Sequence, residues 1–124
     1  MSLISLKPET SELYTLNEFI EDFLGFENLQ LKLIVEEVFI NIVNYSGCDY
    51  IKVNVEYDAP TVTIEFIDNG AEFNPLLKED PKIPKSIDEA KIGGLGIFLT
   101  KEISDEQYYH HANDENHLKI IKKP

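Results

Sequence analysis

The sequence of 124 residues contains no arginine. All eleven basic residues are lysines, and 23 acidic residues outnumber them, which gives a formal net charge of −12. Such an acidic surface repels phosphate backbones, so nucleic acid is not an expected partner. Within a binding site, a phosphate would have to be neutralised by backbone N–H groups, lysines or a metal ion, because no bidentate guanidinium is available.

Cysteine and long apolar runs are also scarce. The single Cys48 cannot form an internal disulfide, so we expect a reducing, cytoplasmic location. No apolar run approaches the roughly 20 residues that span a bilayer, and the polar start does not resemble a signal peptide, so no membrane partner is expected. With 43% hydrophobic and 27% charged residues, the chain has the composition of one globular domain covering residues 1–124.

Hydrophobic periodicity in the first half of the sequence predicts a short strand followed by two helices. Residues 4–6 read as the strand. A helical stripe of apolar residues follows, with Thr10 or Ser11 as its N-cap and Gly25 as its end. A second apolar helix is predicted over about residues 28–45.

The second half predicts two hairpins around a long loop and a third helix. Residues 50–58 and 61–68 alternate apolar and polar side chains, as half-buried strands do. A helix is predicted to begin at Leu95, and residues 107–123 form the last hairpin, with the turn at 113–116. Strand pairs adjacent in sequence favour a mixed, mostly antiparallel sheet with helices on one face, which is a two-layer α+β sandwich.

Three polar residues interrupt the apolar second helix. Glu37 and Asn41 are one turn apart, and Asn44 continues the same stripe. Apolar residues cover most of the remaining circumference, so the stripe is predicted to lie within or beside the core. An amide oxygen at Asn41 suits Mg²⁺, and Glu37 could act as a general base. The alternative interpretation is a stripe that faces solvent at the helix edge.

Two further stretches combine glycine with polar residues. Asp68-Asn69-Gly70 follows a predicted strand, where a carboxylate can accept from an exocyclic amine and glycine lets a ligand lie against the backbone. The stretch "IGGLG" at 92–96 precedes a predicted helix, whose free N–H groups suit phosphates. The plainer interpretations are an ordinary turn for the first stretch and a hinge for the second.

Taken together, E-x-x-x-N on a helix, D-x-G after a hairpin, a long loop and G-G-x-G before a helix resemble the ATP-binding domain of the GHKL (Bergerat-fold) superfamily. The likeness is closest to its anti-sigma-factor serine kinase branch. That branch shows D-x-G-x-x-F-x-P and G-G-L-G, and the matching residues here are Asp68, Gly70, Phe73, Pro75 and Gly93 to Gly96.

The resemblance implies a role for each matching position. Glu37 would be the catalytic base, Asn41 would bind Mg²⁺, and Asp68 would accept from the adenine amino group. Residues 71–92 would form a lid over ATP, in or near which Lys85 and Lys91 are candidate phosphate contacts. The full nucleotide-binding set that the resemblance implies is Asn41, Asn44, Asp68, Gly70, Phe73, Lys91, Gly93, Gly94, Leu95, Gly96 and Thr100.

The resemblance further implies a serine/threonine kinase that uses ATP and Mg²⁺. Its substrate would be an anti-sigma-factor antagonist, a small domain with a target serine. A sigma factor is a further candidate partner, and a homodimer is expected. The missing arginine argues against assuming the sigma factor, because relatives are expected to grip protein partners partly through arginines. Two alternatives stay open: a nucleotide-binding switch module without catalysis, and an acidic interaction domain that binds no nucleotide.

Overall fold

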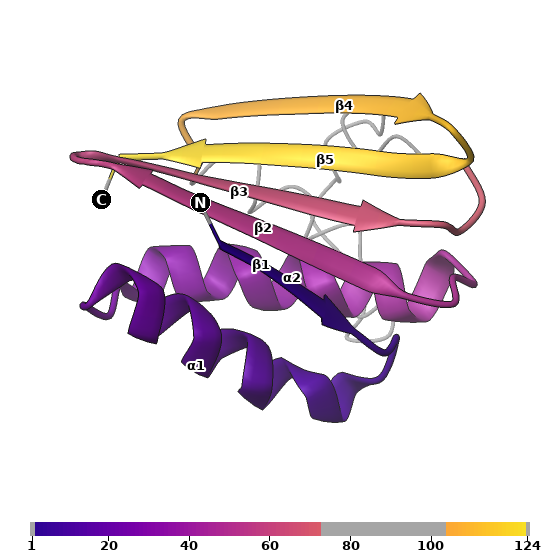
Figure 1. The fold of residues 1–124 in the computed structure, drawn as a ribbon, viewed down its shortest axis with the longest axis horizontal. Helices are drawn as coiled ribbons and strands as arrows, with labels where there is room; N and C mark the ends of the chain where they lie inside the picture. The colour runs from indigo at the N-terminus through magenta and orange to yellow at the C-terminus, as the bar shows by residue number, and fades with distance from the viewer. Residues whose placement is uncertain (1, 73–103, 124) are drawn as a thin grey trace, which may run out of the picture.

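The computed structural model describes residues 2–72 and 104–123. Five strands form one sheet in the order β1-β2-β3-β5-β4, and two helices lie side by side against it (Figure 1). The elements are β1 (Ser2–Leu6), η1 (Thr10–Glu12), α1 (Leu13–Leu24), α2 (Leu29–Tyr45), β2 (Ile51–Asp58), β3 (Thr61–Asp68), β4 (Glu106–Ala112) and β5 (Glu115–Lys122). The predicted two-layer α+β architecture is confirmed.

Every pair of neighbouring strands in the described sheet is antiparallel. A mixed sheet was predicted, but these five strands contain no parallel pair. The two predicted hairpins are both present: β2 pairs with β3 and β4 pairs with β5. Because hairpins join strands that follow one another in the chain, they give an antiparallel ladder without a crossover connection.

Alternation along β2 and β3 builds the sheet side of the hydrophobic core. The apolar residues of these strands that face the helices are at most 1% exposed: Ile51, Val53, Val55, Val62, Ile64 and Phe66. Residues between them point to the opposite face of the sheet, where they are partly exposed. This pattern requires a helical layer on one face only, in agreement with the two described helices.

Helix α1 begins differently from its prediction. Thr10 and Ser11 lie in η1, the residue at the N-cap of α1 is Glu12, and no side chain caps this end by a hydrogen bond. The predicted Thr10 or Ser11 cap is therefore wrong, because the chain enters α1 through a tighter helical turn that places both residues too early. The predicted end is right: Gly25 adopts φ 80° as the C-cap.

Helix α2 packs its apolar stripe against the sheet. Its buried residues are Leu31, Ile34, Val35, Val38 and Phe39, which recur at helical spacing. Asn28 caps the helix, and its side-chain oxygen accepts a hydrogen bond from the backbone N–H of Leu31 at 2.8 Å. These buried residues fix the orientation of α2 about its own axis, and so decide which way its other side chains point.

The β4–β5 turn is shorter than predicted. Its two central residues are Asn113 and Asp114, with φ of 54° and 60°, which is typical of the turn that suits a two-residue hairpin. Strand β5 already begins at Glu115, so the predicted turn at 113–116 is two residues too long. Asn116 is consequently a strand residue, and its side chain shares the inner face of the sheet with Leu118.

Several predicted elements lie outside the described residues. These are the helix from Leu95, the glycine-rich turn before it and nearly all of the lid predicted at 71–92. Among the described residues, no helix is both long and apolar enough to cross a membrane.

Candidate functional site

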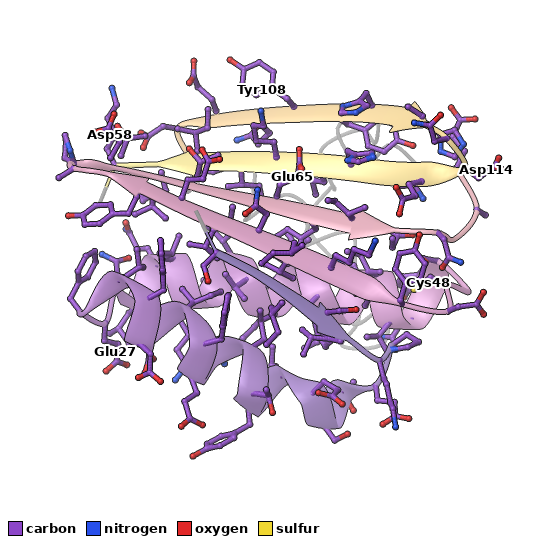
Figure 2. All side chains as sticks on the ribbon, viewed as in Figure 1. Glu27, Cys48, Asp58, Glu65, Tyr108 and Asp114 are labelled. Carbon is purple, nitrogen blue, oxygen red and sulfur yellow. The ribbon has the colours of Figure 1, made fainter. Side chains whose placement is uncertain are left out.

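The ends of α2 and β3 meet the β4–β5 turn at one end of the molecule (Figure 1). Figure 2 places Cys48 and Asp114 at this end. Two hydrogen bonds join α2 to β3: the backbone N–H of Ala71 donates to the carbonyl of Ser46 at 3.0 Å, and the Ser46 hydroxyl donates to Asp68 Oδ1 at 3.0 Å. The segment predicted to bind a ligand is thus held against the C-terminus of α2.

Asp68 is buried at this junction, with an exposed fraction of only 4%. Three donors converge on its Oδ1 atom: the Ser46 hydroxyl, the backbone N–H of Gly70 at 2.9 Å and the Asn116 amide at 3.2 Å. A buried carboxylate needs such donors, because an uncompensated one is very costly. Its other oxygen, Oδ2, receives no hydrogen bond from the described residues.

Gly70 has a packing role that the sequence did not show. A Cβ atom added there would lie 2.1 Å from Ser46 Oγ and 2.3 Å from the Ser46 carbonyl oxygen. Real Cβ atoms do not approach backbone atoms that closely, so only glycine fits between β3 and the end of α2. The predicted role, an approach by a ligand, stays a prediction beside this structural one.

Asn69 ties the site to the start of β2. Its Oδ1 accepts from the backbone N–H of Asp49 at 2.7 Å, and its Nδ2 donates to the Asp49 carboxylate at 3.1 Å. The stretch Asp68-Asn69-Gly70 is therefore more than an ordinary turn, because both polar side chains fasten neighbouring segments. Asp68 contacts the end of α2 and strand β5, and Asn69 contacts the loop before β2.

Two titratable groups near the junction are perturbed. The Tyr50 hydroxyl donates a short hydrogen bond to Glu115, and this bond to a carboxylate raises the pKa of Tyr50 to about 12. Burial raises the pKa of the Cys48 thiol, the nearby Asp68 carboxylate raises it further, and a hydrogen bond with Ser46 opposes both. Neighbouring carboxylates contribute to both shifts, after these larger causes.

The polar stripe of α2 lies beside the core rather than within it. Glu37 and Asn41 are half-buried, whereas Asn44 is exposed and so corresponds to the alternative of a solvent-facing residue. Glu37 makes no hydrogen bond or ion pair with the part of the chain that the structure describes. Its neighbour Glu36 is half-buried too and accepts from the Asn17 amide at 3.2 Å.

The donor chemistry of α2 fits a magnesium ion only in part. The Asn41 amide oxygen is a hard ligand of the kind Mg²⁺ accepts, and it is half-buried on the same helix face as the Glu37 carboxylate. No group of three or more His, Cys, Asp or Glu residues in the described ranges could hold a metal ion. An ion bound at Asn41 would therefore need phosphate oxygens and water to complete its shell.

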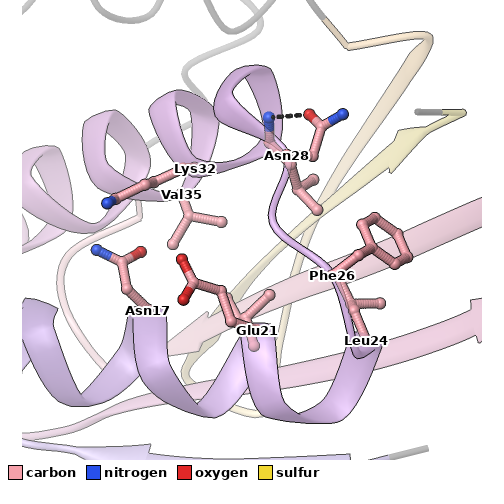
Figure 3. A pocket seen from close by; sticks show the side chains of 9 residues that line it. Asn17, Glu21, Leu24, Phe26, Asn28, Lys32 and Val35 are labelled. Carbon is pink, nitrogen blue, oxygen red and sulfur yellow. Dashed lines mark hydrogen bonds between the residues drawn. The ribbon is translucent and has the colours of Figure 1, made fainter.

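Two cavities lie away from these residues. One, of about 10 Å³, is a gap between α1 and α2, with Asn17 and Glu21 on one side and Lys32 and Val35 on the other (Figure 3). This is the room that about one water molecule needs. The other, of about 130 Å³, opens on the face of the sheet opposite α1 and α2 and is lined by Asn54, Glu56, Thr63, Glu65 and Lys119. Neither includes a residue predicted to bind nucleotide.

The remaining predicted residues cannot be placed. They lie outside the described ranges and comprise Phe73, Lys85, Lys91, Gly93, Gly94, Leu95, Gly96 and Thr100. Of the predicted set, the structure brings Asp68 and Gly70 together at the junction and leaves Glu37, Asn41 and Asn44 along α2.

Sequence reasoning missed Asn116, which is 5% exposed and contacts both Asp68 and the chain that follows it. A signal was present: Asn116 alternates in step with Leu118 and Ile120, so all three side chains point to the same, inner face of β5. The surrounding run of Asn, Asp and Glu concealed it, because these residues favour turns.

Comparisons with known proteins agree with this fold. The histidine kinase-like ATPase domain family matches residues 8–122, so the chain belongs to this family. The predicted likeness to the GHKL superfamily is thereby confirmed, and ATP is the ligand that membership of an ATPase family implies.

Two individual proteins are similar to this chain. One is the serine/threonine-protein kinase BtrW of Bordetella bronchiseptica, 27% identical over 94 residues that make up 73% of this chain and 66% of that kinase. The other is the structure of the histidine kinase AdeS of Acinetobacter baumannii, with a TM-score of 0.53 and 12% identity, covering 99% of this chain and 68% of that one. The second likeness concerns the fold alone.

Proposed function

We propose that this chain binds ATP at the junction of α2, β3 and β5 and transfers its γ-phosphoryl group to a serine or threonine of a partner protein. The observation that carries this proposal is Asp68, a buried carboxylate in an ATPase-family domain. Three donors hold one of its oxygens, and the other receives no hydrogen bond from the described residues. The likeness to a serine/threonine kinase supports the choice of acceptor.

The residues of α2 would do the chemistry. Glu37 would take the proton of the acceptor hydroxyl while the hydroxyl oxygen attacks the γ-phosphorus. The bond between that phosphorus and the bridging oxygen would break, and ADP would leave. Asn41 would hold Mg²⁺, which neutralises phosphate charge when bound. Phosphoryl transfer depends mainly on positioning and charge neutralisation, so two side chains on one rigid helix are a suitable arrangement.

The proposed partner is an anti-sigma-factor antagonist, a small domain that carries the target serine, with a sigma factor as a further candidate. The net charge of −12 favours a partner that presents basic residues around its hydroxyl, because like charges across an interface are costly. A homodimer in the cytoplasm belongs to the same proposal. The homodimer rests on the family resemblance, and the cytoplasm rests on the single cysteine.

Labelled ATP and candidate antagonist domains test the catalytic assignment. We expect wild-type protein to transfer label and Glu37→Gln to transfer at least about a hundredfold less, the usual scale of a lost general base. Glu36→Gln is the matched control, since it alters the next residue and keeps an oxygen for Asn17. Equal transfer by wild type and Glu37→Gln would refute the assignment of the base.

A second candidate function is binding without turnover. It is favoured by Glu37 itself, which has no orienting hydrogen bond from the described residues, whereas a general base is usually held by one. In this case the domain would be a nucleotide-dependent switch for a protein partner. Calorimetry that detects ATP binding, together with assays that find neither phosphoryl transfer nor ATP hydrolysis, would select this function over the first.

A further inference from the structure

Asn116 connects the last two strands to Asp68. It lies directly across the β3–β5 ladder from Asp68, and its Nδ2 donates to Asp68 Oδ1 at 3.2 Å. The same nitrogen donates to the carbonyls of Ala71 at 2.8 Å and Gly70 at 3.4 Å. One buried amide group therefore fixes both the carboxylate of Asp68 and the backbone that follows it.

The chemistry of these neighbours decides which way the amide points. Backbone carbonyls can only accept hydrogen bonds, so the nitrogen of Asn116 must face Gly70 and Ala71. Its oxygen then faces β4, where the Tyr109 hydroxyl donates to it at 2.5 Å. His111 Nδ1 lies 3.2 Å from the same oxygen, and a bond there requires the hydrogen on Nδ1.

A chain of contacts thus runs from Tyr109 on β4 through Asn116 to Asp68. A side-chain amide that is held at both ends cannot rotate, and a carboxylate oxygen with three donors cannot turn away from them. The consequence is a fixed direction for the second oxygen of Asp68.

We propose that Tyr109 and Asn116 are positioning residues that set the base selectivity of the nucleotide site. By fixing the Asp68 carboxylate, they would aim its open oxygen at an exocyclic amino group, and so favour a 6-aminopurine over a 6-oxopurine. This inference rests on the proposed ATP site. Neither residue touches the nucleotide in this scheme, because both act through Asp68.

Parallel titrations with ATP and inosine triphosphate test the inference. The two nucleotides differ in the 6-amino group, which is an oxo group in inosine. We expect wild type to prefer ATP, and Tyr109→Phe and Asn116→Ala to reduce that preference by about tenfold, the scale of one hydrogen bond to a charged group. Tyr108→Phe is the matched control, since the neighbouring hydroxyl bonds Glu106 on the opposite face of β4.

Selectivity distinguishes positioning from a merely structural role. General loosening of the site would weaken the binding of both nucleotides equally and leave the ratio of their dissociation constants unchanged. That result would overturn the inference. So would a full ATP preference in both variants. If Asn116→Ala fails to fold, Tyr109→Phe still tests the inference, because it removes only one hydroxyl group and keeps the aromatic ring.

The failure of the proposed function would look different. Wild-type protein that binds neither nucleotide would refute the ATP site, and the positioning role would fall with it. Wild-type protein that binds both equally would leave nucleotide binding intact and show that Asp68 does not read the amino group.

Discussion

Gly70 and Ser46 lie so close that no side chain fits between them. The Cβ that any other residue carries at position 70 would lie 2.3 Å from the Ser46 carbonyl oxygen. This oxygen belongs to the backbone, so rotation of the Ser46 side chain cannot relieve the contact. Gly70 is therefore the point where β3 and α2 are joined, and the position of Asp68 depends on it.

The first prediction is that Gly70→Ala destabilises the fold. The added methyl group must push the chain away from Ser46, and we expect a loss of at least about 3 kcal/mol in the free energy of unfolding, at the upper end of overpacking effects. Urea denaturation measures this loss. Gly47→Ala is the control: it has φ 65° but open space around it, so it should cost only about 1 kcal/mol. A loss of about 1 kcal/mol or less at Gly70→Ala would contradict the prediction, because it would mean that the contact with Ser46 relaxes cheaply.

The second prediction concerns Asp68→Asn, which separates structure from binding. The amide oxygen can still accept from Ser46, Gly70 and Asn116, so the free energy of unfolding should change by about 1 kcal/mol or less. An NH₂ group replaces the open oxygen, and ATP affinity should fall at least about tenfold, because two donors would then face each other. Calorimetry and urea denaturation measure the two effects.

Asp49→Asn is the control for this experiment, since Asp49 is an exposed carboxylate bonded to Asn69. Its ATP affinity should match that of wild type. Unchanged ATP affinity in Asp68→Asn would remove Asp68 from the binding site.

The third prediction is a loss of stability at high pH through Tyr50. Its pKa is raised to about 12 from an ordinary value of 10.0 by the hydrogen bond to Glu115. The folded state holds this proton more tightly than the unfolded state does. The stabilisation is therefore complete below about pH 10 and is lost as the pH rises toward about 12.

Ultraviolet titration of tyrosinate absorbance, followed with urea denaturation over the same pH range, tests this prediction. Tyr50→Phe should lack both the late ionisation step and its share of the stability loss. A Tyr50 that ionises at the ordinary tyrosine value of 10.0 would contradict the prediction.

The fourth prediction is a cost of about 1 kcal/mol for Asn28→Ala. The substitution removes the acceptor for the Leu31 N–H at the start of α2, and lost N-caps cost about this much. Thermal or urea denaturation measures the loss. Asn44→Ala, at an exposed position of the same helix, should stay within about 0.5 kcal/mol of wild type. An equal effect at both positions would mean that the cap bond contributes nothing.

The fifth prediction is that the Cys48 thiol reacts slowly in the native protein. It is 9% exposed and its pKa is raised, so little reactive thiolate is present or accessible at neutral pH. Alkylation followed by mass spectrometry should show a rate that increases strongly in denaturant. Because Cys48 is the single cysteine, any label reports on this position alone. Equal rates in native and unfolded protein would contradict the burial.

Local patterns predicted the elements well where each pattern has one physical cause. Alternation gave β2 and β3, because only a strand puts every second residue on one face. The apolar helical pattern gave α2, and Gly25 gave the end of α1. The N-terminal cap of α1 was wrong because Thr10 and Ser11 are as suitable for a tight turn as for a cap.

The candidate site could be predicted only in part. Asp68 and Gly70 were selected because polar residues and a glycine directly follow an apolar strand, and their binding of a ligand stays a prediction. Asn116 and Tyr109 were missed, since their partners are up to 48 residues away in the chain. Nothing in a local window shows that an amide in β5 will lie opposite a carboxylate in β3.

The sequence alone determined the helices and strands, the family resemblance and the acidic character of the surface, because periodicity, motif spacing and charge can be read residue by residue. Only the tertiary structure decided what surrounds Asp68. Antiparallel pairing of β3 with β5 put Asn116 across from it, and the approach of α2 put Ser46 against Gly70. Those contacts join segments distant in the chain, and their geometry depends on strand register and helix packing, which no short stretch of sequence specifies.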